Sequence, residues 1–96
     1  MKLVAITFHF EYTEAIAEIL DRSGIVDYVR FPMIEGKDVE GKHFGSQVFP
    51  GNSSVVHAQV LEENLDALLD ELTRFRDAKP AHRHLTALVL PIDRRI

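Results

Sequence analysis

Two hydrophobic periods alternate along the chain, and their order constrains the fold more than any other feature of the sequence. Apolar residues recur at every second position, as in a β-strand, over residues 2–10, 25–34, 54–61 and 84–90. They recur at helical spacing over residues 13–23 and 62–76. The apolar stripe of the second helix consists of Leu65, Leu68, Leu69, Leu72 and Phe75. The chain is therefore expected to run strand, helix, strand, strand, helix, strand.

This order is that of the α+β, ferredoxin-like βαββαβ arrangement, and residues 1–96 are long enough for a single domain. We expect an antiparallel sheet in the order fourth, first, third, second strand, except that the two central strands, the first and the third, should run parallel. Both helices should cover one face of the sheet. Leu3, Ala5 and Val55 would lie on the other face, where an exposed apolar patch predicts an interface between copies of the chain.

Particular residues are expected to set the ends of these elements. Thr13 is a candidate N-cap for the first helix, because a threonine hydroxyl accepts a hydrogen bond from an unpaired backbone N–H. Gly24 stands where a left-handed residue would end that helix. Pro32 predicts an edge position or a strand end, since proline has no N–H to donate to a neighbouring strand. Pro80 is expected to stop the second helix.

A polar, glycine-rich segment separates the second and third strands. It holds four of the five glycines and shows neither a strand nor a helical period. A loop of this length in a small domain is usually functional or disordered, and Phe44, Val48 and Phe49 argue against simple disorder. We therefore expect a flexible binding loop over about residues 35–54. Its candidate ligand-binding residues are Gly36, Lys37, Gly41, Lys42, Gly45, Gln47, Pro50, Gly51 and Asn52.

The glycines of this loop would let backbone N–H groups surround an anion, with charge added by Lys37 and Lys42. Their spacing matches neither the P-loop nor the dinucleotide-binding pattern. The alternative is a connector in which glycine only makes turns.

Composition excludes several classes of function. The chain has no cysteine, which excludes disulfides and thiolate metal sites and fits a reducing cytoplasm. No secretory signal or membrane-spanning run is expected from the sequence, so we predict a cytoplasmic protein without membrane insertion. A formal charge of -4 disfavours nucleic acid as a partner. Apolar residues at 46% indicate an ordinary globular chain.

Basic residues nevertheless gather in two places. Lys79 and Arg83 follow the second helix, and Arg94 and Arg95 lie in the C-terminal tail. Arginine suits bidentate contacts to phosphate, so Lys79, Arg83 and Arg94 are further candidates for ligand binding, facing a neighbouring copy. The alternative is a charge balance at the end of a helix and a solubilising tail.

Three histidines are expected at one edge of the sheet. The first and fourth strands should be antiparallel neighbours, which would bring His9 close to His84 and His82. Three imidazoles could hold a divalent transition metal such as zinc, nickel or copper. The alternative is a set of solvated histidines. His57 is expected in an interface or the core, and His43 is open to either use.

Catalysis has little support in the sequence. Glu35, Asp38 and Glu40 are carboxylates in a loop, with no rigid element to place a pair of them. No serine stands in a nucleophile-elbow pattern. We expect no enzyme, and a small enzyme acting at a cleft between subunits is the third-ranked hypothesis.

The βαββαβ order, the interface-like sheet face and the segment GKDVEGKHFGSQVFPGNS (residues 36–53) together resemble the PII signal-transduction superfamily over nearly the whole chain. The long loop looks like the T-loop, and its sequence is more similar to the PII-like branch than to the nitrogen-sensing members. That branch is often associated with membrane transporters, including heavy-metal efflux systems. The resemblance implies a homotrimer with adenine nucleotides in the clefts between subunits, and loops that dock onto a transporter or enzyme.

The chain departs from that pattern after the second helix. PII proteins that bind ATP carry the glycine-rich B-loop T-G-x-x-G-D-G-K there, whereas residues 77–84 are DAKPAHRH, without glycine. The loop also has no tyrosine for uridylylation. The CutA family shares the trimeric fold, but its tryptophan- and cysteine-containing segments are missing.

These features lead to one hypothesis and one alternative. The hypothesis is a trimeric PII-like regulator that senses a nucleotide or a metal ion at intersubunit clefts and signals through the loop. The alternative is a CutA-like or histidine-based metal-binding module without signalling.

Overall fold

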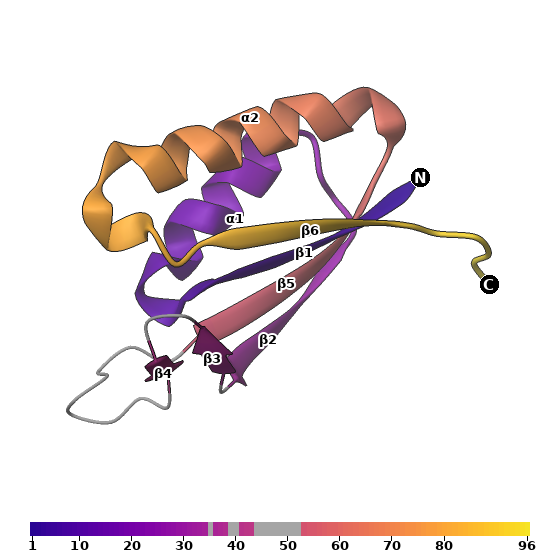
Figure 1. The fold of residues 1–96 in the computed structure, drawn as a ribbon. Helices are drawn as coiled ribbons and strands as arrows, with labels where there is room; N and C mark the ends of the chain where they lie inside the picture. The colour runs from indigo at the N-terminus through magenta and orange to yellow at the C-terminus, as the bar shows by residue number, and fades with distance from the viewer. Residues whose placement is uncertain (35, 39–40, 44–52) are drawn as a thin grey trace.

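Two helices cover one face of a four-stranded sheet and leave the other face open (Figure 1). This computed structural model describes residues 1–34, 36–38, 41–43 and 53–96. The strands of the sheet are β1 (Lys2–His9), β2 (Tyr28–Ile34), β5 (Ser53–Val60) and β6 (Thr86–Pro91). The helices are α1 (Thr13–Arg22) and α2 (Glu62–Ala78), and the 3-10 turns are η1 (Phe10–Tyr12) and η2 (Pro80–His82).

The sheet order is β2-β5-β1-β6, which confirms the predicted spatial order of the four strands. The prediction of parallel central strands is wrong, since β1 and β5 run antiparallel, with Lys2 opposite Val60 and His9 opposite Ser53. In a split βαβ unit the second strand of the unit is not the neighbour of the first. The strand that fills the gap arrives through a direct connection and therefore runs the opposite way.

The core lies between the sheet and the helices. Every second residue of β1 and β5 is buried there: Val4, Ile6, Phe8, Val56, Ala58 and Val60. The helices cover them with Ile16, Ile19, Leu20, Leu68 and Leu72. These positions confirm both predicted helical stripes.

The first helix begins at Thr13 and ends before Gly24 as the sequence predicts, but the predicted N-cap is wrong. Gly24 has a φ of +76°, and the N–H of Ile25 donates to the carbonyl of Leu20 at 3.0 Å. This is the Schellman arrangement, and the buried Ile25 packs into the core instead of starting a strand. Thr13 is not the N-cap, because Tyr12 occupies that position and the Thr13 hydroxyl donates to the carbonyl of Phe10 at 2.5 Å. The 3-10 turn η1 leads directly into the helix, and no side chain of the described residues caps its first turn.

Strand β2 is an edge strand, as Pro32 predicts, and its register with β5 shifts between Phe31 and Ile34. At this irregularity the hydroxyl of Ser54, which is fully buried, donates to the carbonyl of Pro32 at 2.6 Å. Strand β6 begins at Thr86, two residues later than predicted, because His82–Leu85 form a turn in which Leu85 N–H bonds to the carbonyl of His82.

A small two-stranded sheet lies within the segment for which no strand was predicted. Strand β3 (Gly36–Asp38) pairs antiparallel with β4 (Gly41–His43) (Figure 1). Strands of three residues are too short to show a two-residue period, so the sequence pattern could not reveal them.

Candidate functional site

One end of the main sheet gathers three connections. There the segment between β2 and β5 leaves the sheet, β1 turns into α1, and α2 turns into β6 (Figure 1). Ser53 is paired with both His9 and Ile34, and Thr86 is paired with Thr7. The described ends of the predicted binding loop and the turn that carries Lys79 and Arg83 therefore lie at the same end of the sheet, with β1 between β5 and β6.

A basic hollow of about 520 Å³ opens beside that turn. Its lining consists of Arg76, Asp77, Lys79, Pro80, Arg83, Leu85 and Thr86. Asp77 is paired with Arg76 through an N–O distance of 3.1 Å, which offsets one of the three cations. The hollow therefore carries an excess of positive charge, suited to an anionic group, and the predicted residues Lys79 and Arg83 both lie in it.

A cluster of aromatic rings packs around His82 in this turn. The ring of His82 stacks on Phe75 with a centroid distance of 4.0 Å and meets the edge of Tyr12 at 4.6 Å. His82 is only 8% exposed, and its Nδ1 lies 2.6 Å from the carbonyl oxygen of Phe75. Burial, and secondarily the carboxylate of Glu11, raise the pKa of the Tyr12 phenol, so it stays neutral at physiological pH.

The three histidines expected together do not share one position. His9 and His84 stack with a centroid distance of 4.9 Å, which confirms the expected approach of these two residues. His82 instead belongs to the cluster with Phe75 and Tyr12. Within the described ranges, no group of three or more His, Cys, Asp or Glu side chains is placed to hold a metal ion. Metal binding by all three histidines stays a prediction.

The C-terminal tail lies at the opposite end of the sheet from the turn between α2 and β6 (Figure 1), beside which the basic hollow opens. Arg95 pairs there with Asp27 at 3.2 Å, and the neighbouring Arg94 is exposed. A single chain therefore does not bring Arg94 to the hollow, and its predicted role in ligand binding requires a second copy.

The other candidates lie in the loop. Gly36, Lys37, Gly41 and Lys42 belong to the backbone of β3 and β4. Gly45, Gln47, Pro50, Gly51 and Asn52 fall outside the described residues, as do Glu35, Glu40 and the greater part of the predicted flexible loop.

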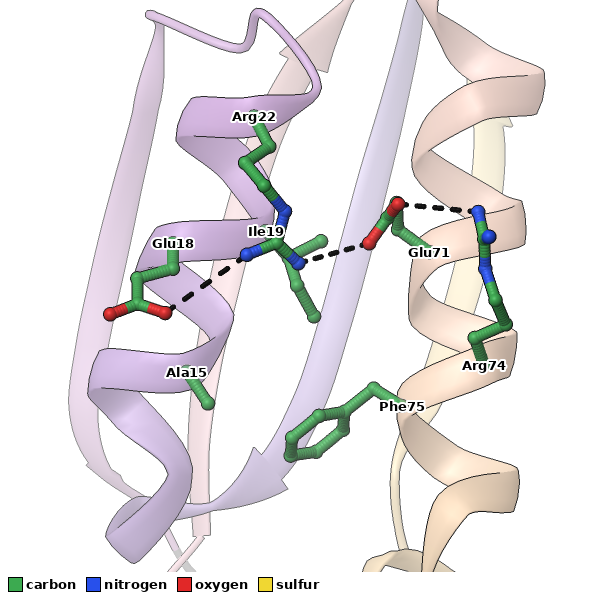
Figure 2. A pocket seen from close by; sticks show the side chains of 7 residues that line it. All are labelled: Ala15, Glu18, Ile19, Arg22, Glu71, Arg74 and Phe75. Carbon is green, nitrogen blue, oxygen red and sulfur yellow. Dashed lines mark hydrogen bonds and ion pairs between the residues drawn. The ribbon is translucent and has the colours of Figure 1, made fainter.

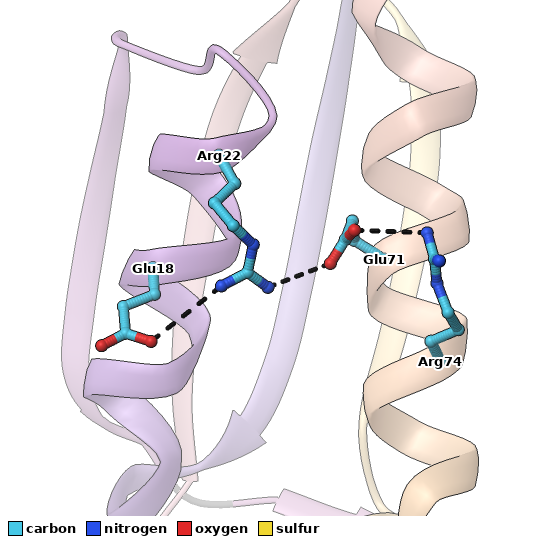
Figure 3. A network of polar contacts seen from close by, with 4 residues as sticks. All are labelled: Glu18, Arg22, Glu71 and Arg74. Carbon is cyan, nitrogen blue, oxygen red and sulfur yellow. Dashed lines mark hydrogen bonds and ion pairs between the residues drawn. The ribbon is translucent and has the colours of Figure 1, made fainter.

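A second hollow, of about 360 Å³, lies between the helices on their outer side (Figure 2). Arg22 of α1 reaches across to Glu71 of α2 at 3.0 Å, and Arg74 contacts the other oxygen of Glu71 at 3.2 Å (Figure 3). Glu18 lies 4.0 Å from Arg22. Because its two arginines and two glutamates balance, this hollow offers no net attraction to an anion, and the contacts instead fasten α1 to α2.

Glu71 is the centre of this ion-pair network. The hydrogen bond from Arg22 is the main reason why the pKa of Glu71 lies below its usual value, and the charges of Arg74 and Arg22 add to it, while partial desolvation acts in the opposite direction. This network has no signal in the sequence, since Arg22 and Glu71 are far apart along the chain and the packing of the helices makes them neighbours.

The open sheet face is apolar, as the sequence predicts. It carries Leu3, Ala5, Val29, Phe31, Val55, Leu88 and Leu90, which the strand pairing places on the side away from the helices. Val29 is 58% exposed and Leu88 63%. His57 is half-buried on this face and meets the edge of Phe31 at 5.1 Å. Exposed apolar patches of this kind mark interaction surfaces.

The antiparallel sheet with both helices on one face defines an α+β protein of the ferredoxin-like class. Among solved structures the chain is similar to CPII, a nitrogen regulatory PII-like protein from Thiomonas intermedia K12. The form of CPII bound to ADP, AMP and bicarbonate matches with a TM-score of 0.78 and 23% identity, over 95% of this chain and 90% of CPII. The form of CPII bound to ADP, AMP and acetate matches with a TM-score of 0.73 and 25% identity, over 95% of this chain and 84% of CPII.

A PII-like signalling protein from Thermus thermophilus matches with a TM-score of 0.57 and 20% identity, over 92% of this chain and 81% of that protein. The chain therefore has the fold of PII-like proteins, and the resemblance drawn from the sequence is confirmed at that level. No protein-family model and no curated protein matches the chain. In the described part of the chain, no helix is long and apolar enough to cross a bilayer.

Proposed function

We propose that this chain is a PII-like regulator that binds an adenine nucleotide at clefts between three copies and signals through residues 35–54 to a transporter or enzyme. The observation that carries the proposal is the basic hollow beside Lys79 and Arg83, in a chain with the fold of a protein that binds ADP and AMP. The nucleotide phosphates would bind in the hollow.

Geometry supports a connection between the hollow and the signalling segment. His84 follows Arg83 directly and stacks on His9, and His9 is paired with Ser53, where the segment rejoins the sheet. A ligand shifts a conformational equilibrium only if it binds one state better than the other. A phosphate bound by Arg83 would be connected to the segment through His84, His9 and Ser53, and this chain of contacts could carry such a difference.

The subunit contact in this proposal is the open sheet face. Its exposed side chains, including Val29 and Leu88, would be costly to leave in water. Assembly would also give Arg94 access to the hollow of a neighbouring copy.

Titration with ADP, AMP and ATP tests the proposal. Wild-type protein is expected to bind at least one of them with micromolar or tighter affinity. Replacing Arg83 by Gln should weaken binding by about 10- to 100-fold, the usual worth of a hydrogen bond to a charged group. Arg74→Gln is the matched control, since it removes the same charge from the balanced network between the helices. Equal affinities for Arg83→Gln and the wild type would contradict the proposed site.

The stacked pair of His9 and His84 favours a second candidate, the binding of a divalent transition metal. Two imidazoles supply half of a tetrahedral site, so the remaining ligands would come from outside the pair. Calorimetric titration with zinc, nickel and copper should show binding that is lost in His84→Ala and kept in His57→Ala. Unchanged binding in His84→Ala would exclude this pair as the site.

A further inference from the structure

The turn between α2 and β6 keeps its shape without glycine because its backbone donors are used internally. The N–H of His82 donates to the carbonyl of Lys79 at 3.0 Å, and the N–H of Arg83 to that of Pro80 at 3.2 Å. The N–H of Leu85 donates to the carbonyl of His82 at 3.1 Å. A glycine-rich loop holds phosphate with free backbone N–H groups. These three N–H groups are not available to an anion, which makes the side chains of Lys79 and Arg83 the main candidates for its recognition.

Side chains that recognise an anion must be held in place, and the turn has one buried side chain that can do so. The imidazole of His82 lies nearly parallel to the ring of Phe75, at an interplanar angle of 5°, and against the edge of Tyr12. Its Nδ1 faces the carbonyl of Phe75 at 2.6 Å. A carbonyl oxygen only accepts hydrogen bonds, so Nδ1 carries the proton and donates it. His82 thus ties the turn to the last turns of α2.

Two cations of the hollow, Lys79 and Arg83, lie on either side of His82 along the chain. The carbonyl of Lys79 accepts the backbone hydrogen bond of His82, and Arg83 follows His82 directly. The guanidinium of Arg83 also donates to the carbonyl of Pro80 at 3.3 Å, which keeps it beside the turn. Movement of the imidazole would therefore move both cations relative to the hollow.

We propose that His82 is the positioning residue of the anion site, acting through its Nδ1–H hydrogen bond to Phe75 and not by touching the ligand. The inference rests on the proposed function, because it concerns the same hollow. It assigns His82 to ligand affinity, apart from any role in metal binding.

Two substitutions separate the hydrogen bond from the ring. His82→Asn keeps an N–H donor near the place of Nδ1 but removes the ring that packs on Phe75. His82→Phe keeps a ring for that packing but removes the donor. Stability should follow the buried ring, since loss of packing leaves a cavity, so the Phe variant should melt at the higher temperature. Affinity for the anion should depend on the N–H donor, so the Asn variant should bind it more tightly than the Phe variant. The order of the two variants in affinity is therefore expected to be the opposite of their order in thermal stability.

The test measures the dissociation constant for ADP by calorimetry and the thermal midpoint of each full-length variant. ADP affinity should stay within about threefold of wild type in His82→Asn and fall by about tenfold or more in His82→Phe, as expected for a lost hydrogen bond that orders charged groups. Affinities that rise and fall with the thermal midpoints, or that equal wild type in both variants, contradict the inference alone. Failure of the wild-type protein to bind ADP contradicts the proposed function and the inference together.

Discussion

At the scale of single residues, two positions show how local chemistry fixes the path of the chain. Gly24 ends α1 in the left-handed region, and Ser54 satisfies the carbonyl of Pro32 where β2 loses its regular pairing. Gly24 lies where the chain leaves α1, and Ser54 lies in β5 beside the irregular part of β2. Each makes a prediction about stability.

Gly24→Ala should lower the free energy of unfolding by about 1 kcal/mol, because a residue with a Cβ pays a conformational penalty at positive φ. The cost is conformational and not steric, since among the described residues a Cβ at this position would meet only Asn64 Nδ2, at 3.8 Å. Urea unfolding measures the change. Gly24→Asn should lose less, since asparagine tolerates this region better. A neutral Gly24→Ala would contradict the left-handed assignment.

Ser54→Ala should cost about 1–3 kcal/mol, because it removes a buried hydroxyl and leaves the carbonyl of Pro32 without this donor. Ser23→Ala is the control. The Ser23 hydroxyl is buried too but has no hydrogen-bond partner in the described part of the structure, so its removal should be nearly neutral. Denaturant midpoints for the two variants decide the matter, and equal losses would count against the Ser54 bond.

At the scale of elements, the helices are joined by charges as well as by the core. The lowered pKa of Glu71 means that its carboxylate is favoured in the folded state. This stabilisation is fully present above the usual value of 4.5 and is lost as the pH falls from there through the lower value of the folded state.

We therefore expect Glu71→Gln to lower the thermal midpoint at pH 7, with a difference from wild type that shrinks as the pH is lowered below about 4.5. Thermal melts across that range provide the measurement. Asp70→Asn, on the exposed side of α2, is the control and should show a smaller difference at pH 7. A difference for Glu71→Gln that is constant with pH would show that the network does not act through the carboxylate charge.

The sequence predicted these elements well wherever burial imposed a period. The alternation of Val4, Ile6 and Phe8 and the stripe through Leu68 and Leu72 follow directly from which face meets the core. Their order then fixed the fold class and the spatial order of the strands.

What the sequence could not predict are contacts that depend on how the chain folds and not on a hydrophobic period. The bond between Arg22 and Glu71, the three-residue strands β3 and β4, and the packing of His82 against Phe75 leave no repeating pattern. Lys79 and Arg83 could be proposed as candidates because charge at the end of a helix is visible in the sequence, and their role in ligand binding stays a prediction. The sequence could not predict that His82 lies apart from the stacked pair of His9 and His84, because this separation depends on how the turn after α2 folds.

At the scale of the whole molecule, the proposed assembly of three copies depends on the open sheet face. Leu88→Glu places a charge on that face, in the edge strand β6, and a buried unpaired charge is strongly unfavourable. We expect this variant to be monomeric and folded, with weakened ADP binding because the cleft is lost. Val26→Glu is the matched control, since Val26 is 93% exposed outside the sheet. Gel filtration and circular dichroism measure the two properties, and an assembled Leu88→Glu variant would place the contact elsewhere.

The most direct test of the central claim is the molar mass of the unmodified chain by light scattering, measured with and without ADP. The proposed trimer should have a molar mass of about three times the 10.9 kDa of one chain and should bind one ADP per chain. A stable monomer that binds ADP with undiminished affinity would contradict it, because the nucleotide would then need no cleft between copies.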